Sequence, residues 1–327
     1  MTSKVAVVGT GGWAEQHARL FARREDTELV AVVGRTQERT TARADRYGAR
    51  AYTDIERMLD AEQPDLVTVS LPNEHHFATT LQLLGAGVPL LVEKPLVFDL
   101  GEADELLAAA GNRFFAINFN HRYAETVQRA RSAIQRGEIG ELTFASWRFG
   151  GEPGTSAHPH AQLIETQCHA FDLLEYLCGP IASDAAQMTD KTGRGYSTTA
   201  IALEFENGAV GTLLGSYDSS YAYPRSHYLE VNGAAGRFTI EDTVKRLTMS
   251  RTGDEVASVW EAGYFNDEGR DFHATFGLHL DVLVPALLAG GAPPVHAVAG
   301  RRALELAIAS IASFETGRRT STLAGAR

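Results

Sequence analysis

The chain has 327 residues, of which 44% are hydrophobic and 22% charged. This composition excludes a disordered chain, a collagen-like chain and a small scaffold held by disulfides. At roughly 150 residues per domain, the length predicts about two domains with a cleft between them. With 30 basic and 41 acidic residues, the net charge is -11, and no basic run could follow a nucleic-acid backbone. We therefore expect no nucleic-acid partner, and any anion site must be a local arrangement of backbone amides and cations.

Two further regions argue against a membrane protein. Residues 1–12 run directly into an apolar strand pattern, without the features of a secretory signal peptide. The longest apolar region, residues 276–300, is interrupted by Asp281, Pro285 and pairs of Gly and Pro, so it cannot cross a bilayer as one helix. We expect a cytoplasmic protein with no membrane partner.

In the first third of the chain, short β-branched runs alternate with helical stretches, as in parallel strands joined by crossover helices. Because the runs are apolar on both sides, we expect buried strands with helices on each face. The expected strands are residues 5–8, 29–33, a short one near 51, 66–70, 90–92 and 114–118. The pattern predicts an α/β domain with a doubly wound parallel sheet over residues 1–120.

After residue 120, apolar and polar residues alternate as they do in antiparallel strands. The expected strands are residues 142–149, 197–205, 209–216, 227–231, 237–240, 246–249 and 256–260. Helices are expected at residues 124–136, 163–177, 273–288 and 297–314. We predict an α+β domain over residues 121–327 with a large, mainly antiparallel open sheet. Its uncovered face is expected to pair with other subunits in a homodimer or homotetramer.

The first expected strand ends in a glycine-rich turn typical of dinucleotide sites. Gly9, Gly11 and Ala14 match the pattern G-x-G-x-x-A. In this pattern the first glycine makes the turn, the second admits a pyrophosphate and the alanine allows close helix packing. Gly12 and Trp13 complete the cofactor loop, and the next helix presents its amino terminus to the phosphates. The alternative interpretation is a tight turn without a ligand.

The second expected strand lacks the acid that binds the ribose hydroxyls in NAD-specific sites. It ends instead in Gly34, Arg35 and Thr36. Arg35 could stack on the adenine and pair with a 2′-phosphate, while Thr36 donates a hydroxyl and Arg39 adds charge. This arrangement favours NADP. If the arginines are only solvated surface residues, NAD is the alternative.

Two later strand ends are expected to face the nicotinamide, because the carboxyl ends of parallel strands form the ligand crevice. The residues of these two turns are Leu71, Pro72 and Asn73, and Glu93, Lys94 and Pro95. A lysine beside a cationic nicotinamide is pushed toward its neutral form, so Lys94 can exchange a proton with a substrate hydroxyl. His76 follows the first turn and is assigned to the cofactor side, with a plain helix-start residue as the alternative.

In the second domain, Glu165, His169 and Asp172 fall at helical spacing and share one expected helix face. A carboxylate that orients an imidazole is a common arrangement for general base catalysis. With His160 the same residues could bind a metal, and they could also form only a salt bridge. We expect no metal, because hydride transfer with a lysine does not need one. Candidate substrate contacts on loops are His158, His160 and Tyr223. Plain loop positions are the alternative for these three.

Taken in order, these segments resemble the Gfo/Idh/MocA family of NAD(P)-dependent oxidoreductases over nearly the whole chain. The matching segments are KVAVVGTGGWAEQH, DLVTVSLPNEHH, VEKP, FNHRY, IETQCHAFDLLEYLCG and a closing helix with ALELAIASIASFE. The resemblance implies a Rossmann cofactor domain. It also implies reversible oxidation of a secondary alcohol on a sugar, sugar derivative or cyclitol.

The resemblance further implies roles for single residues. Lys94 would contact both nicotinamide and substrate and precede a peptide bond to Pro95 that is often cis. His169 would act as acid and base, and Asn73 would lie beside the nicotinamide ribose. Asn120 and Arg122 match a family segment at the domain junction. These two are assigned to the cofactor site.

The two acids of the expected helix match the family pattern to different degrees. Asp172 matches an acid that commonly follows the family histidine, whereas Glu165 stands where many members have Asp. The longer side chain leaves open which substrate hydroxyl Glu165 binds. The Gly-Arg-Thr ending of the second strand resembles NADP-using members. Two other activities remain as alternatives: a glycosidase that oxidises, eliminates and reduces again with held NAD, and a regulator that senses the nucleotide.

Overall fold

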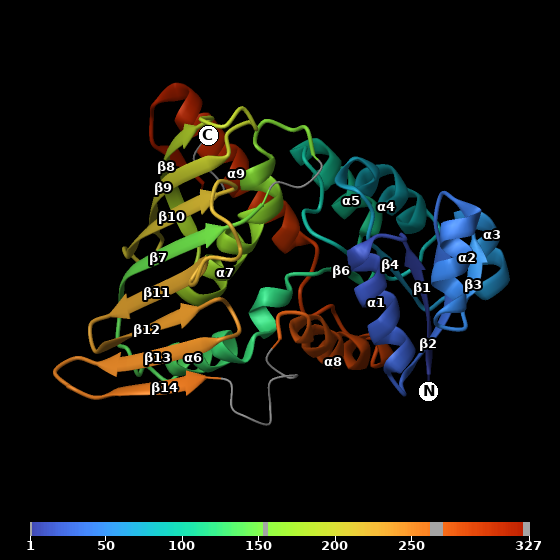
Figure 1. The fold of residues 1–327 in the computed structure, drawn as a ribbon, viewed down its shortest axis with the longest axis horizontal. Helices are drawn as coiled ribbons and strands as arrows, with labels where there is room; N and C mark the ends of the chain where they lie inside the picture. The colour runs from blue at the N-terminus through green and yellow to red at the C-terminus, as the bar shows by residue number, and fades with distance from the viewer. Residues whose placement is uncertain (1, 153–155, 262–270, 323–327) are drawn as a thin grey trace. The chain divides into compact units, whose positions relative to one another are not determined.

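A computed structural model describes residues 2–152, 156–261 and 271–322, which form two compact units (Figure 1). The first unit consists of Met1–Phe119 and Phe276–Arg301, and the second of Asn120–Thr275 and Arg302–Arg327. A single division near residue 120 therefore misplaces residues 276–301. The reason is apolar packing: Leu280, Leu283 and Val284 share one buried core with Val5 and Phe21.

The first unit has a six-stranded sheet in the order β3-β2-β1-β4-β5-β6, with every neighbouring pair parallel. Its strands are β1 (Ser3–Val8), β2 (Thr27–Val33), β3 (Arg50–Tyr52), β4 (Leu66–Val69), β5 (Leu90–Val92) and β6 (Phe115–Ile117). This sheet confirms the predicted doubly wound domain. From β1 the chain adds β2 and β3 on one side of the sheet, and then β4, β5 and β6 on the other. The switch point of the strand order therefore lies between β1 and β4, and such folds bind their ligands at this point.

Helices connect these strands and supply the rest of the first unit's core. They are α1 (Gly12–Arg23), α2 (Gln37–Asp45), α3 (Ile55–Glu62), the short η1 (Asn73–His75), α4 (His76–Gly85), α5 (Leu100–Ala110) and α8 (Ala274–Leu288). In α1 the buried residues Ala14, Ala18 and Phe21 recur every three to four positions, which places them on one helix face. That face and the strand residues beneath it hold the glycine turn in place.

The second unit has a nine-stranded sheet in the order β14-β13-β12-β11-β7-β10-β9-β8-β15. Its strands are β7 (Leu142–Gly150), β8 (Ile181–Thr189), β9 (Thr198–Phe205), β10 (Val210–Ser216), β11 (His227–Gly233), β12 (Gly236–Glu241), β13 (Arg246–Arg251), β14 (Ala257–Glu261) and β15 (Thr320–Ser321). Only β7 and β10 pair in parallel among these described strands. The mainly antiparallel sheet is as predicted.

Two strands of this sheet were not predicted, β8 and β15. The sequence of β8 is rich in Ala and contains Asp184, and both residue types are depleted in strands. Pairing with β9 along its whole length creates the strand. The two-residue β15 then adds to its outer edge.

Helices cover one face of the second sheet (Figure 1). They are the short η2 (Asn120–Tyr123), α6 (Glu125–Gln135), α7 (Cys168–Cys178) and α9 (Val298–Thr316). Ser310 of α9 donates a hydrogen bond to Asp184 of β8 over 3.0 Å, which anchors that helix. Phe144, Val210 and Leu214 project from the sheet and are 43–54% exposed. These three apolar side chains lie on a face of the second sheet that the described residues do not cover.

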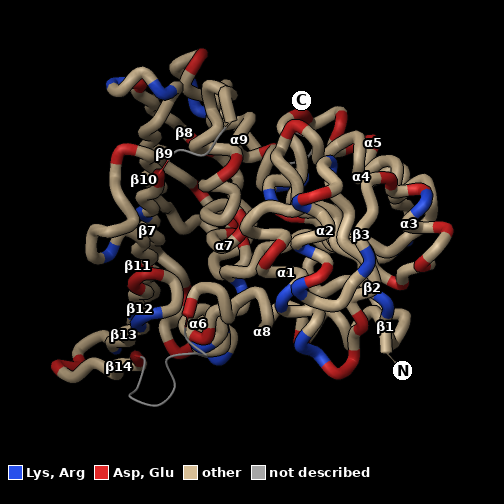
Figure 2. The backbone as a smooth tube through the Cα atoms, turned by 45° about the vertical axis from the view of Figure 1, so that its right-hand side comes forward, with Lys and Arg blue, Asp and Glu red and all other residues tan. Residues whose placement is uncertain are grey.

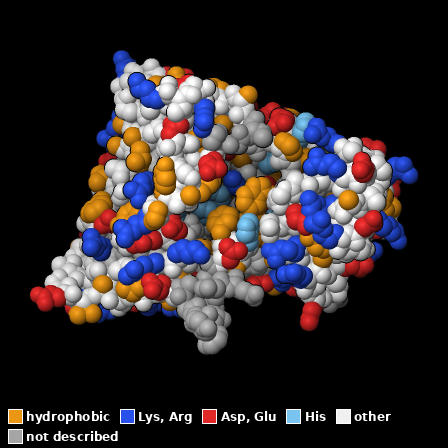
Figure 3. All heavy atoms as spheres, viewed as in Figure 1, with side chains coloured by type: hydrophobic (Ala, Val, Ile, Leu, Met, Phe, Trp, Pro, Cys, Tyr) orange, Lys and Arg blue, Asp and Glu red, His pale blue; other side chains and the backbone are white. Residues whose placement is uncertain are grey.

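Charge is distributed over both units. Figure 2 shows basic and acidic positions interspersed along the backbone, and Figure 3 shows the same mixture of signs on the surface in view. The net charge of -11 is therefore spread over many places. Within the described ranges, no helix is both long and apolar enough to cross a lipid bilayer.

Candidate active site

The glycine turn after β1 has the geometry that a dinucleotide site requires. Gly9 has φ +135°, and a Cβ there would lie 2.0 Å from the carbonyl oxygen of Ser70, so only glycine fits. A Cβ on Gly11 or Gly12 would meet no atom within 4 Å, and α1 has no side-chain N-cap. Open space therefore lies beside a helix amino terminus, and the residues present fit a pyrophosphate there.

Trp13 follows these glycines and is fixed by the returning α8. Its ring stacks on Phe276 with centroids 5.4 Å apart and planes 10° apart, although 44% of Trp13 is exposed. A flat apolar surface thus borders the glycine turn within the first unit. Trp13 stays a predicted cofactor contact.

The end of β2 carries the three residues on which the choice of NADP depends. Arg35, Thr36 and Arg39 are all exposed. Arg35 Nη1 donates to Nε2 of His75 over 3.3 Å, which brings the end of β2 next to the turn after β4. Two guanidinium groups and a hydroxyl are therefore accessible where an adenosine ribose would bind.

A buried network lies behind Lys94 and was not predicted. Oε1 of Glu93 accepts hydrogen bonds from Nε2 of His17 and from Nδ2 of Asn118, both over 2.7 Å. Nδ1 of His279 in α8 donates in turn to the side-chain oxygen Oδ1 of Asn118 over 2.8 Å. Burial opposes ionisation of Glu93, but His17, Lys94 and Asn118 outweigh it and lower its pKa. The site therefore contains a buried carboxylate directly beside Lys94.

One member of this network was open to prediction. Asn118 follows β6, and the rule that placed Lys94 at a strand end applies equally to it. His17 and His279 carry no comparable signal, because a histidine on an apolar helix face is an ordinary core residue.

His76 joins the two turns that were expected to face the nicotinamide. Its Nδ1 lies 2.9 Å from the carbonyl oxygen of Pro95, and its Nε2 lies 2.9 Å from that of Leu71. Burial lowers the pKa of His76, so the neutral ring donates to one of these carbonyls at a time. The peptide bond between Lys94 and Pro95 is cis, as the resemblance implies. His76 thus positions the Lys94 turn.

In the second unit, the predicted continuous helix over residues 163–177 is wrong in its first turn. Gln162–Thr166 forms a π-helical turn, closed by the bond from Gln167 N to Gln162 O over 3.3 Å. The α-helix α7 starts only at Cys168. Glu165 and His169 therefore lie on differently wound segments, and α-helical spacing does not describe their relation. Such π turns occur frequently at functional sites.

The candidate base His169 belongs to a buried aromatic cluster. Its ring stacks on His121 of η2 with centroids 4.0 Å apart and planes 7° apart. His227 of β11 meets the edge of His121 at 5.7 Å, and Phe149 of β7 meets it at 6.1 Å. Burial lowers the pKa of His227 to about 3, so this third imidazole stays neutral. His121 was not predicted, because only the fold brings it to His169.

Asp172 is held by Arg122. Arg122 donates from Nε to Oδ2 over 2.9 Å and from Nη2 to Oδ1 over 2.5 Å. Both carboxylate oxygens are thus engaged, which differs from the expected orienting contact to His169. Burial raises the pKa of Asp172, and Arg122 opposes that rise. Asn120 donates to the Thr275 hydroxyl over 2.7 Å, so Asn120 and Arg122 both have structural partners within the second unit.

The predicted substrate contacts lie on loops of the second unit. His158 and His160 form the turn that leads into the π-helical segment, and His160 stacks on Tyr196 at 4.7 Å. Burial lowers the pKa of both histidines. Tyr223 is 61% exposed. Residues 153–155 of the predicted substrate loop lie outside the described residues.

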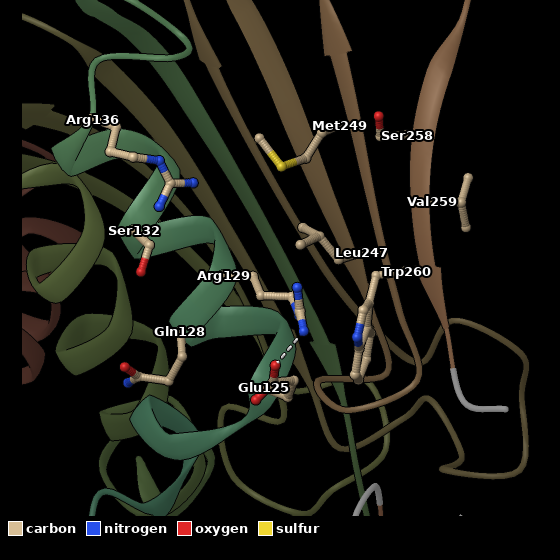
Figure 4. Close-up of a pocket in the computed structure, with 10 residues that line it drawn as sticks. All are labelled: Glu125, Gln128, Arg129, Ser132, Arg136, Leu247, Met249, Ser258, Val259 and Trp260. Carbon is tan, nitrogen blue, oxygen red and sulfur yellow. Dashed lines mark ion pairs between the residues drawn. The ribbon is translucent and has the colours of Figure 1, made fainter. Parts of the chain in front are cut away.

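An open pocket of about 540 Å³ lies elsewhere, between α6 and the strands β13 and β14. Figure 4 shows Arg129 of α6 facing Trp260 of β14 there, with the guanidinium carbon 5.5 Å from the ring centre. Arg129 also pairs with Glu125 over 2.8 Å. None of the predicted site residues lines this pocket, so the histidine cluster remains the candidate site of this unit. In the described part of the chain, no three His, Cys, Asp or Glu residues group as a metal site would.

The fold and the glycine turn define a dinucleotide-binding class of protein, and the comparisons identify the family. Residues 3–116 match the family described as "Oxidoreductase family, NAD-binding Rossmann fold", and residues 127–239 match the "GFO/IDH/MocA C-terminal domain". The chain belongs to the Gfo/Idh/MocA family of oxidoreductases.

Two curated proteins are similar to this chain in sequence, and one solved structure is similar to it in fold. D-glucoside 3-dehydrogenase of Escherichia coli is 33% identical over 189 residues, so the match spans only 54% of each chain. Inositol 2-dehydrogenase of Rubrobacter xylanophilus is 26% identical over 96% of this chain and 91% of its own. An NAD binding oxidoreductase from Klebsiella pneumoniae has the same fold, with a TM-score of 0.89 over 99% of this chain and 100% of its own at 18% identity.

Proposed function

We propose that this chain catalyses the reversible oxidation of a secondary alcohol on a sugar, sugar derivative or cyclitol, with NADP favoured over NAD. The observation that carries this proposal is Lys94 at the carboxyl end of β5, on the same edge of the parallel sheet as the glycine turn that follows β1. Named relatives support the substrate class, because they act on a glucoside and on inositol.

In this proposal the nicotinamide supplies the hydride acceptor. The Gly9 to Ala14 turn binds the pyrophosphate, and Lys94 donates a hydrogen bond to the reacting hydroxyl oxygen. His169 takes the hydroxyl proton during oxidation and returns it during reduction. Glu93, held as an anion by His17 and Asn118, places a negative charge next to Lys94.

The same proposal includes a homodimer or homotetramer. The uncovered sheet face with Phe144, Val210 and Leu214 supports assembly, because exposed apolar groups on a sheet are stabilised by a second subunit. The substrate-contacting part of the site is assigned to the second unit, with His158, His160, Glu165 and Tyr223 as its candidate residues.

The substrate class is tested by following NADPH and NADH absorbance with a panel of sugars, keto-sugars and inositols. We expect absorbance to change with at least one polyol and NADP, and the reverse reaction to consume NADPH with the matching ketone. Failure with every polyol would contradict the proposal. Release of sugar from an aryl glycoside without net change in absorbance would then identify a glycosidase.

The cofactor preference is tested by Arg35→Ala. We expect the variant to weaken NADPH binding by about 10- to 100-fold and NADH binding by less than about threefold, since a charge-assisted bond to the 2′-phosphate is lost. Binding titrations with both nucleotides measure the two changes. The exposed Arg194→Ala, on a loop of the second unit, serves as the matched control. Equal weakening of both nucleotides would refute the 2′-phosphate role.

A further inference from the structure

The parallel stack of His121 on His169 joins two separate elements of the second unit. His121 lies in η2 and His169 in α7, and both side chains are buried, with relative exposures of 2% and 5%. Their planes differ by only 7° at a centroid distance of 4.0 Å. One whole face of the candidate base is thus covered by a second imidazole.

The His121 ring is itself held at its edges. Phe272 meets it at 5.4 Å with an interplanar angle of 87°, Phe149 at 6.1 Å and 63°, and His227 at 5.7 Å and 73°. His227 is held in turn by Thr243, whose hydroxyl lies 2.6 Å from its Nδ1. These three rings pack around the His121 ring, which lies with its face toward His169.

The backbone that carries His121 is also fixed to α7. Arg122 forms its two hydrogen bonds to Asp172, one helical turn beyond His169. The side chain of Gln128 donates to the Arg122 carbonyl over 2.5 Å. Moving η2 away from α7 would break this buried pair, so the backbone of His121 stays close to α7. A tilt of the His169 ring toward His121 would therefore have to displace the His121 ring.

We propose that His121 is a positioning residue for His169: it fixes the plane of that imidazole and limits the stacked pair to one proton. A base must be held within a fraction of an ångström of its productive geometry. Two imidazolium rings in face contact repel each other, so the second proton binds with difficulty. The proposal rests on the proposed function, in which His169 exchanges the hydroxyl proton.

The repulsion between two protonated rings also depends on the other ionisable groups around the stack of His121 on His169. His227 from β11 stays neutral because burial lowers its pKa to about 3. The carboxylate of Asp172 from α7 is engaged by Arg122 from η2, and the two charges compensate each other. Phe149 from β7 and Phe272 contribute no charge. Glu165 in the π turn and His273, whose ring meets that of Phe272 at 5.9 Å, are the further ionisable side chains of these elements.

Three substitutions separate the positioning role from space filling. We expect His121→Ala to lower kcat by about 10- to 100-fold with KM for substrate and cofactor nearly unchanged. His121→Phe, which keeps a flat ring against His169, is expected to retain kcat within about threefold of the wild type. His121→Leu fills a similar volume without a flat face and is expected to resemble the Ala variant. Thermal unfolding curves of all three variants check that each is folded.

Two kinetic outcomes would overturn the proposal. Equal kcat values for the Leu and Phe variants would mean that His121 only fills space. A Phe variant as slow as the Ala variant would mean that the ring nitrogens of His121 take part directly, as a second acid or base.

An NMR titration tests the shared proton without any substrate. In the wild type we expect the imidazole signals of His169 to titrate over a broad range with a Hill coefficient below one, and those of His121 to change with them. In His121→Phe the His169 titration is expected to become a single-site curve. A single-site curve in both proteins would overturn proton sharing. If no polyol is oxidised, the proposed function fails, whereas this titration still decides whether the stack is coupled.

Discussion

Lys94→Met is expected to lower kcat by about 1,000-fold or more while the cofactor still binds. Methionine fills a volume close to that of lysine but offers no hydrogen-bond donor to the substrate hydroxyl. Glu93, His17 and Asn118 keep their mutual bonds in this variant, because none of these bonds involves the Lys94 ammonium group. The glycine turn is likewise unchanged, so pyrophosphate binding survives.

Stopped-flow kinetics and a nucleotide binding titration measure the two quantities separately. Lys191→Met, which removes an exposed lysine from a loop, is the matched control and is expected to leave kcat unchanged. Full activity in Lys94→Met would remove Lys94 from the catalytic site. Loss of nucleotide binding in that variant would instead assign Lys94 mainly to the cofactor.

Features of the cofactor domain were predictable because they are local in the sequence. Buried parallel strands are continuous apolar runs, and their carboxyl ends meet at one edge of the sheet. This rule alone brought together Gly9, Asn73 and Lys94, which are far apart along the chain. The same rule did not assign residues 276–301 to the first unit, because the sequence of an apolar helix does not indicate which of two hydrophobic cores the helix packs against.

The less predictable contacts connect residues far apart in the sequence through side chains. His17 bonds to Glu93 across 76 positions and His279 to Asn118 across 161. Helical spacing predicts neighbours only within one regular helix, and it failed even at Glu165, where the helix winds as a π turn. The partner of His169 is likewise supplied by another element, η2, so no spacing rule reaches it.

Arg122→Met is expected to destabilise the folded chain by about 3–5 kcal/mol near neutral pH, since it leaves the Asp172 carboxyl buried without its partner. The Asp172 side chain is only 2% exposed, and burial already raises its pKa above 3.8. Without Arg122 the folded-state pKa rises further. Between pH 4 and 7 the unfolded chain then loses a proton that the folded chain retains, so the free energy of unfolding falls as pH rises.

Urea unfolding of the wild type and the variant at pH 4.5 and pH 7.5 tests this sign, and the deficit is expected to be larger at pH 7.5. Arg122→Met combined with Asp172→Leu removes both charges and is expected to regain much of the loss, because apolar replacement of a whole buried pair is often neutral. If the deficit is independent of pH and the double variant is no more stable, the pair contributes packing alone. A stable double variant would also separate stability from catalysis, because its fold would be intact while the ionic tie between η2 and α7 would be lost.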